Sequence, residues 1–102
     1  MIRGAPIMRV AGREKLEKFM RKHAAAKKPL SVWLSLVERE LWQGPQDIKN
    51  LYRSVDFLSA NRVVFNIGGN NFRLVVVVRY TASVVWIDRI GTHSEYEKWK
   101  LE

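Results

Sequence analysis

The sequence contains no cysteine, and this absence excludes several kinds of site at once. A chain without thiols forms no disulfide framework, no thiolate metal centre and no cysteine nucleophile. Histidine is also scarce, because His23 and His93 are the only two. Two histidines are too few for a metal site unless several carboxylates join them. We therefore expect the protein to work without a metal and without a small-molecule cofactor.

Acidic residues and long apolar runs are scarce as well. The chain has 10 Asp and Glu against 18 Lys and Arg, which gives a net charge of +8. This balance makes a polyanion the leading partner class, although an acidic protein or an anionic membrane surface would fit charge alone. No stretch is apolar enough to span a bilayer, and residues 1–6 lack the hydrophobic region of a signal peptide. The sequence thus predicts a cytoplasmic protein with no membrane association.

The chain is long enough, at 102 residues, for one domain with a modest core. We predict a single domain over residues 1–102, in which residues 1–7 form a loose leader. An edge strand is predicted at residues 7–11. A helix is predicted over residues 12–25, because apolar residues recur there at helical spacing and His23 suits its end.

A second helix begins near Pro29 and carries the clearest apolar stripe. Its members are Leu30, Trp33, Leu34, Val37 and Leu41. Gly44 and Pro45 end this helix and start a third, short one, with Ile48, Leu51 and Tyr52 predicted to be buried. We interpret Trp33 and Trp42 as core residues, and residues 54–60 as a connector held down by Val55, Phe57 and Leu58.

Residues 61–96 organise the rest of the chain, because they hold three β-rich runs. The first two runs are separated by Gly68-Gly69-Asn70-Asn71, and a Gly-Gly-Asn cluster between apolar runs is typical of a tight hairpin turn. Residues 81–83 separate the second run from the third. The sequence therefore predicts an antiparallel three-stranded meander in the middle of the sheet.

Side chains alternate along a strand, so the turn length decides which residues share a face. One face is apolar throughout: Val63, Phe65, Ile67, Phe72, Leu74, Val76, Val78 and Tyr80. The other face mixes valines with polar residues: Arg62, Val64, Asn66, Arg73, Val75, Val77 and Arg79. On the third strand this second face continues either with Val84, Trp86 and Asp88 or, after a three-residue turn, with Val85, Ile87 and Arg89.

The arginine-bearing face has two interpretations. Half-exposed antiparallel sheets usually have a solvated outer face, and arginines there need no further role. Alternatively, Arg62, Asn66 and Arg73, with His93 and Tyr96 at the rim, suit the cleavage of RNA without a metal. Arginine can hold two phosphate oxygens at once, and histidine can transfer a proton near neutral pH. Gly91 is predicted to end the third strand, and Thr92 with Glu95 predicts a capped short helix that places His93 and Tyr96 on one side.

Four stretches carry a resemblance to a known family. They are Met8-Arg9-Val10, the run from Trp42 to Lys49 (WQGPQDIK), the run from Asn61 to Val75 (NRVVFNIGGNNFRLV) and the run from Ile90 to Tyr96 (IGTHSEY). From Met8 to Trp99 the chain resembles the HigB toxins of bacterial type II toxin–antitoxin systems. The resemblance implies an α+β, RelE-like fold, a twisted antiparallel β-sheet with helices packed on one face.

The resemblance also implies an activity and a set of site residues. It implies an endoribonuclease that cleaves mRNA on translating ribosomes, and a HigA-type antitoxin partner with a helix-turn-helix domain. Arg73, His93 and Tyr96 match the catalytic segments of the family, with Arg73 at the scissile phosphate and His93 as general acid or base. The residues expected to contact RNA are Lys49, Arg62, Asn66, Asn71 and Arg79. Glu97 stands where relatives often have Asp.

Two other classes of function remain open on the sequence. A non-catalytic RNA- or ribosome-binding module could use the same basic face, and so could a subunit that docks an acidic protein partner. The distinguishing observation is whether the purified protein cuts RNA.

Overall fold

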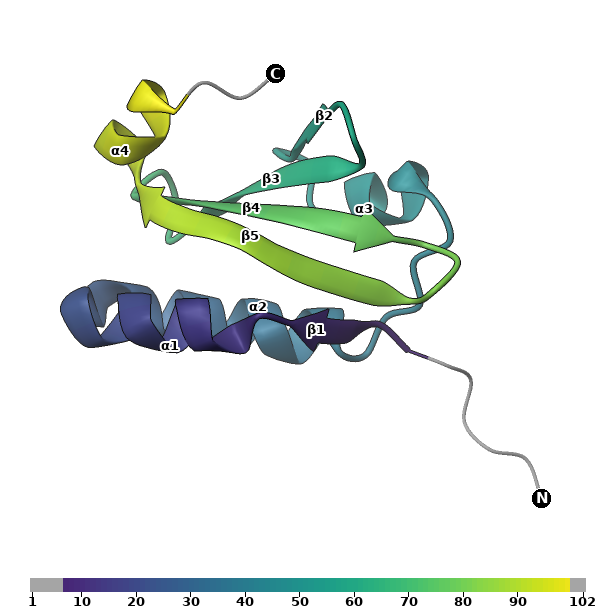
Figure 1. Ribbon diagram of the computed structural model, residues 1–102, viewed down its shortest axis with the longest axis horizontal. Helices are drawn as coiled ribbons and strands as arrows, with labels where there is room; N and C mark the ends of the chain where they lie inside the picture. The colour runs from purple at the N-terminus through teal and green to yellow at the C-terminus, as the bar shows by residue number, and fades with distance from the viewer. Residues whose placement is uncertain (1–6, 100–102) are drawn as a thin grey trace.

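A computed structural model describes residues 7–99 and shows one five-stranded sheet with helices around it (Figure 1). The strands are β1 (Arg9–Ala11), β2 (Asp56–Leu58), β3 (Arg62–Ile67), β4 (Phe72–Arg79) and β5 (Val84–Thr92). The helices are α1 (Arg13–Lys22), a 3-10 turn η1 (Ala24–Ala26), α2 (Lys27–Val37), α3 (Pro45–Leu51) and α4 (His93–Lys98). The predicted leader at residues 1–7 falls outside the described residues except for Ile7, and the single-domain organisation over residues 1–102 stays a prediction.

The sheet order is β1-β5-β4-β3-β2, so the predicted meander lies in its middle. The α+β class is confirmed, but a wholly antiparallel sheet is wrong, because β1 runs parallel to β5. No hairpin joins β1 to β5, and the intervening chain is long enough to allow either direction. The connector predicted at residues 54–60 contains β2, whose three residues pair with the start of β3. Such a short strand leaves no alternation in the sequence to detect.

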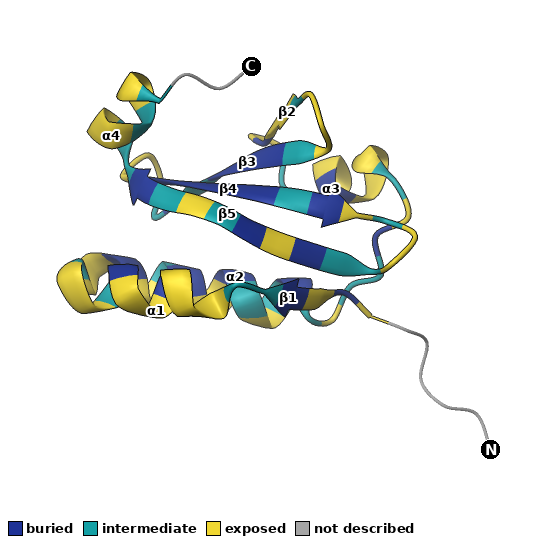
Figure 2. Cartoon of the chain, viewed as in Figure 1, coloured by how far each residue is buried: buried dark blue, intermediate teal, exposed yellow. Residues whose placement is uncertain are grey.

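The apolar face of the sheet forms the core, and α1 and α2 lie together along one side of the sheet (Figure 1). Phe65 is at the centre of this core, with the rings of Trp33, Trp42 and Tyr52 at 5.4, 6.3 and 5.0 Å between centroids. The core interpretation of both tryptophans is confirmed, since each is at most 2% exposed. Figure 2 shows the buried residues concentrated along the central strands.

Two predicted core positions differ from the structure, and a third residue lies outside its predicted helix. Leu51 and Phe57 are each 41% exposed, because both lie at the margin of the fold, where fewer elements can cover them. Leu41 lies beyond α2, which ends at Val37, yet it still packs against the core.

The β3–β4 turn is built as its residues predict, with φ of +62° at Gly68 and +69° at Gly69. Both values lie in the left-handed region, which glycine adopts without steric cost. The turn contacts the helical layer, since a Cβ added to Gly68 would lie 3.5 Å from Pro29 Cγ. Nearby, the ring of Phe19 stacks on His23 at 4.3 Å and meets the edge of Phe72 at 5.6 Å. This end of the sheet is therefore joined to α1.

A β-bulge in β5 settles the question that alternation left open. Val76 pairs with Ile87 and Val75 pairs with Arg89, so Asp88 is the extra residue. Val84, Trp86 and Asp88 share the arginine-bearing face, as the first alternative predicted. Arg89, which only the second alternative placed on this face, lies there as well, because it follows the bulge. A bulge turns neighbouring side chains to the same side. We call the surface that includes Asn66, Arg73, Val77, Trp86 and Arg89 the open face.

Truncating Phe65 should produce the largest loss of stability among single ring deletions. Phe65→Ala removes a side chain that is 1% exposed and contacts three other rings, so the free energy of unfolding should fall by about 3–5 kcal/mol. Urea denaturation measures this. The control is Val32→Ala on α2, where the side chain is 51% exposed and the change should stay within about 0.5 kcal/mol. Equal losses in the two variants would contradict this account of the core.

Tyr52 should make stability depend on alkaline pH. Burial, assisted by the charge of Glu40, raises the pKa of Tyr52 to about 12 from an ordinary value of 10.0. The unfolded phenol therefore loses its proton first, and the free energy of unfolding should decline as pH rises from 10.0 to about 12. Urea titrations across this range measure the slope. Tyr52→Phe should lack this contribution, and an unchanged slope in that variant would contradict the assignment.

Candidate active site

Arg73 is the centre of the candidate site, and it is a buried cation. It lies near the start of β4, between Asn66 on β3 and Gly91 on β5, and only 8% of it is exposed. Its Nη1 donates to the carbonyls of Asn70 and Phe72 at 3.1 and 3.2 Å, and its Nη2 donates to Asn70 Oδ1 at 2.6 Å. A buried charge is costly unless it is hydrogen-bonded, and these neutral acceptors meet that need.

Within the part of the chain that the structure describes, no carboxylate forms an ion pair with this guanidinium. Neither of the ion pairs found among residues 7–99 includes Arg73. Oxygen dipoles from the β3–β4 turn hold its orientation while its full positive charge remains. A preorganised cation without a counter-ion is suited to an incoming anion such as a phosphate.

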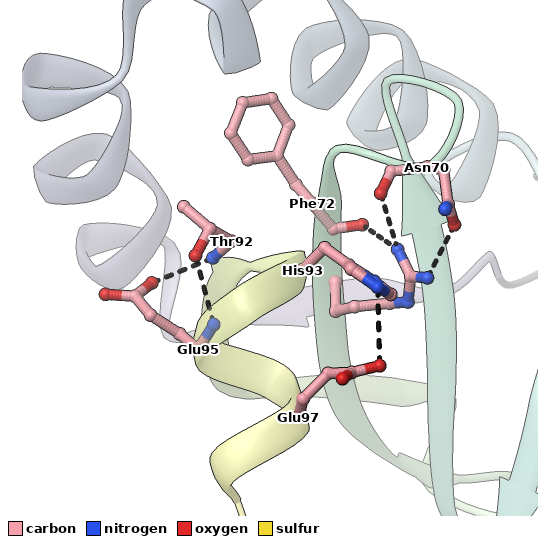
Figure 3. A network of polar contacts seen from close by, with 7 residues as sticks. Asn70, Phe72, Thr92, His93, Glu95 and Glu97 are labelled. Atoms are coloured by element: carbon pink, nitrogen blue, oxygen red, sulfur yellow. Dashed lines mark hydrogen bonds and ion pairs between the residues drawn. The ribbon is translucent and has the colours of Figure 1, made fainter.

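The short helix α4 places His93 beside this turn. Thr92 and Glu95 form the predicted capping box, with Glu95 N donating to Thr92 Oγ1 at 3.1 Å and Thr92 N donating to Glu95 Oε1 at 2.8 Å. The backbone N–H of His93 donates to the carbonyl of Asn71 at 2.9 Å. Figure 3 shows the cap, His93 and the turn residue Asn70 in one view. The capped helix therefore fixes the imidazole at the corner occupied by Arg73.

The imidazole of His93 is partnered on one side only. Its Nε2 lies 3.3 Å from a carboxylate oxygen of Glu97, one helical turn on. Its Nδ1 is covered and has no hydrogen-bond partner among the described residues. The side chain as a whole is 43% exposed, so the ring can be approached from solvent. Glu97 can thus orient the ring.

Two aromatic rings join α4 to the open face. The guanidinium of Arg73 lies 5.5 Å from the ring centre of Tyr96, and Tyr96 meets Trp99 edge-on at 5.8 Å. Arg89 lies 5.0 Å from the ring centre of Trp99. Cation–π contacts of this kind contribute roughly 0.5–2 kcal/mol, depending on solvent exposure. The helices are therefore not all on one face, because α4 reaches the face opposite α1 and α2.

The sequence-predicted site residues fall into two groups. Arg73, His93, Tyr96, Asn66 and Asn71 meet at one corner, where Asn66 pairs directly with Arg73. Arg62, Arg79 and Lys49 lie elsewhere. Arg79 is six residues along β4 from Arg73, or about 20 Å at about 3.3 Å per residue.

The other two cations, Arg62 and Lys49, donate hydrogen bonds to nearby backbone carbonyls. Arg62 donates through Nε to Ser59 O at 3.0 Å, and Lys49 donates to Arg53 O at 2.6 Å. Lys49 belongs to α3, which lies at the end of the molecule opposite α4 in Figure 1.

Three residues of the site were missed by sequence reasoning. Asn70 holds the guanidinium of Arg73, while Trp99 and Arg89 complete the series of cation–π and ring contacts. The signal for Asn70 was its place in the turn three residues before Arg73. Arg89 could not be placed because the bulge at Asp88 changes the alternation.

The fold and this corner define a small basic α+β protein with an anion-holding site. Comparison with known families places it further: residues 26–99 match HigB_toxin, described as the RelE-like toxic component of a toxin-antitoxin system. This match spans most of the chain, and the chain belongs to that family.

Curated relatives agree with the family assignment. The chain is 29% identical over 63 residues to proteins named "mRNA interferase toxin HigB" in Escherichia coli strain K12 and "mRNA interferase HigB" in Escherichia coli O157:H7 and Shigella flexneri. Each alignment covers 60% of this chain and 61% of the relative. The chain thus spans less than two thirds of the curated relatives it matches.

Two further features are absent from the described residues. Among residues 7–99, no three His, Asp or Glu side chains are grouped in a way that could hold a metal ion. None of the helices in that range has the length and apolar character needed to cross a membrane.

Gly91 should tolerate no side chain, because Trp99 packs against it. A Cβ at this position would lie 2.7 Å from Trp99 Cζ2 and 2.9 Å from Glu95 Oε1, closer than real contacts allow. Gly91→Ala should displace Trp99 from Arg89 and destabilise the fold by about 1–3 kcal/mol. The indole N–H resonance of Trp99 and urea denaturation measure both effects.

The matched control is Gly44→Ala. Gly44 has an extended backbone, with φ of −171°, and a Cβ there would meet no atom within 4 Å. Its substitution should leave the Trp99 resonance in place. If Gly91→Ala also leaves that resonance in place, the packing of Trp99 on Gly91 is wrong.

Proposed function

We propose that this toxin-family protein is an endoribonuclease that cleaves mRNA on translating ribosomes and so inhibits translation. One observation supports this most directly: a buried guanidinium without a counter-ion lies at the same corner as a partly exposed histidine. The names of the curated relatives, which describe mRNA interferases, support the same activity. The RelE-like twisted arrangement of the sheet, which the family description implies, is part of this proposal.

In the proposed reaction, the ribose 2′-hydroxyl loses its proton and attacks the adjacent phosphorus. The bond from phosphorus to the 5′-oxygen breaks, and that oxygen takes up a proton, which leaves a 2′,3′-cyclic phosphate and a 5′-hydroxyl. Arg73 holds two phosphate oxygens as their negative charge increases. His93 transfers one of the two protons as general acid or base. Glu97 keeps the imidazole oriented through the 3.3 Å contact with Nε2.

Tyr96 is the third residue proposed to take part in the reaction. Its ring already lies against Arg73, so it can stack on a base beside the scissile phosphate or assist the proton transfer. Asn66 and Asn71 would contact the RNA at the same corner. Arg62, Arg79 and Lys49 would hold the RNA backbone at a distance, through phosphate contacts that carry no sequence information.

The proposal includes the cellular setting. The protein would act in the cytoplasm, and a HigA-type antitoxin with a helix-turn-helix domain would neutralise it. A toxin–antitoxin family implies such a partner, and the net charge of +8 favours an acidic surface on it.

Removing the proposed catalytic groups should abolish toxicity. Arg73→Ala and His93→Ala should each relieve growth arrest on expression, because one removes the phosphate-binding cation and the other removes the proton carrier. Arg73→Lys should also lose most activity, since an ammonium cannot hold two oxygens in one plane. Mapping of mRNA 5′ ends after brief expression, with and without translation, measures cleavage.

Circular dichroism and urea denaturation show whether each variant is folded. The matched control is Arg53→Ala, which removes an exposed cation two residues after the end of α3 and should keep full toxicity. Full toxicity of folded Arg73→Ala and His93→Ala would refute the assignment of chemistry to this corner. If the wild-type protein binds RNA on translating ribosomes but never cuts it, the protein is a binding module instead.

A further inference from the structure

The open face has a second feature, a groove at the end of β4 and β5 away from Arg73. Its lining residues are Val77, Arg79, Trp86 and Asp88, and it encloses about 470 Å³. Trp86 is 54% exposed, although β5 is an internal strand of the sheet flanked by β1 and β4. A large aromatic ring exposed in the interior of a sheet contributes little to the core.

The groove combines apolar, aromatic and charged side chains, and the packing of the core does not require this combination. Val77 pairs with Trp86 across the strands, and these two side chains supply the apolar part of the lining. Arg79 and Asp88 supply a positive and a negative group. No ion pair within residues 7–99 joins them, so each charge is available to a ligand.

The bulge at Asp88 explains why the carboxylate faces this groove. In a regular strand Ile87 and Arg89 would share a face, but the extra residue lets Ile87 stay buried while Asp88 and Arg89 turn to the open face. Bulges often re-aim side chains beside active sites. On one side of the bulge Arg89 contacts Trp99, and on the other side Trp86 lines the groove together with Asp88.

We propose that this groove is a binding subsite for a flanking, unpaired nucleotide of the single-stranded RNA substrate. The base stacks on Trp86 above Val77, Arg79 contacts a phosphate, and Asp88 accepts hydrogen bonds from the base edge. Flat rings stack on exposed aromatic side chains in most proteins that bind single strands. This inference deepens the proposed function, because the same RNA strand would occupy both places.

Continuity with the Arg73 corner favours RNA over a protein ligand. Arg73, Val77 and Arg79 lie on one face of β4, with Val77 about 13 Å from Arg73 at about 3.3 Å per residue. Arg89 lies between the two places on β5. A strand bound at Arg73 can therefore follow this face and pass two further cations.

Asp88 should give the subsite a preference among bases. A carboxylate accepts hydrogen bonds from the amino group of adenine or cytosine. Uracil offers two carbonyl oxygens around a single N–H, and these oxygens repel a carboxylate. We therefore expect adenine and cytosine to bind several-fold more tightly than uracil.

Binding of RNA hexamers tests the subsite without any need for cleavage. Hexaadenylate, hexacytidylate and hexauridylate should quench the fluorescence of the exposed Trp86 in the wild-type protein. Trp86→Ala should weaken binding of the first two about tenfold, and Trp86→Phe should restore part of the loss. Asp88→Asn should reduce the discrimination against hexauridylate. Nuclear magnetic resonance shifts give the dissociation constant for variants that lack the tryptophan.

The matched control is Phe57→Ala. Phe57 is an exposed aromatic residue on β2, 41% exposed, and its removal should leave all three affinities unchanged. Equal affinities of Trp86→Ala and the wild type overturn the subsite, and so does the lack of any hexamer binding by the wild type. A Trp86→Ala variant that binds RNA normally but no longer binds the antitoxin also overturns it and assigns the groove to a protein.

Cleavage gives an independent outcome. If Trp86-dependent binding is observed but the wild type never cuts mRNA, the subsite stands and the proposed activity fails. If the wild type cuts mRNA and Trp86→Ala cuts it at the same positions and rate, the activity stands and the subsite fails.

Discussion

The unbroken apolar face of β3 and β4 is the constraint on which the rest of the fold depends. Water-exposed valine, leucine and phenylalanine over that area would cost more free energy than the fold can offset, so α1 and α2 must cover them. Alternation then assigns every second residue to the opposite side. The open face receives its arginines for this reason, and among residues 7–99 Tyr96 of α4 and the adjoining Trp99 lie against them.

The open face is organised by oxygen dipoles and aromatic rings rather than by carboxylates. Arg73 is held by Asn70 and Phe72 carbonyl oxygens, and both Arg73 and Arg89 lie against rings carried by or adjoining α4. These partners fix the direction of each guanidinium but leave its charge uncancelled. Asp88 is the carboxylate on this face, and the bulge places it in the groove beside Trp86 rather than next to Arg73. The two halves of the face thus differ in the ligand groups they can accept.

Local pattern was enough to predict the meander, the Gly68–Gly69 turn, the Thr92–Glu95 cap and the core role of Trp33. It failed where distant parts of the chain decide the outcome. The direction of β1 depends on a partner more than seventy residues away, and β2 exists only because β3 offers it an edge. At the site, the structure places Arg73, His93 and Tyr96 at one corner, and the catalytic roles that the resemblance implies for them stay a prediction. The roles of Trp99 and Arg89 depend on a one-residue bulge, and no propensity of Asp88 signals it.

The stack of Phe19 on His23, with Phe72 at its edge, joins the helical layer to the first residue of β4. Phe72 precedes Arg73 directly, and its carbonyl is one of the three oxygens that hold the guanidinium. The end of α1 is therefore connected to the anion site through a single residue, Phe72. A protein built in this way has little scope for a partly melted but competent form. Heating should remove the helical layer and the ability to hold an anion in a single cooperative step.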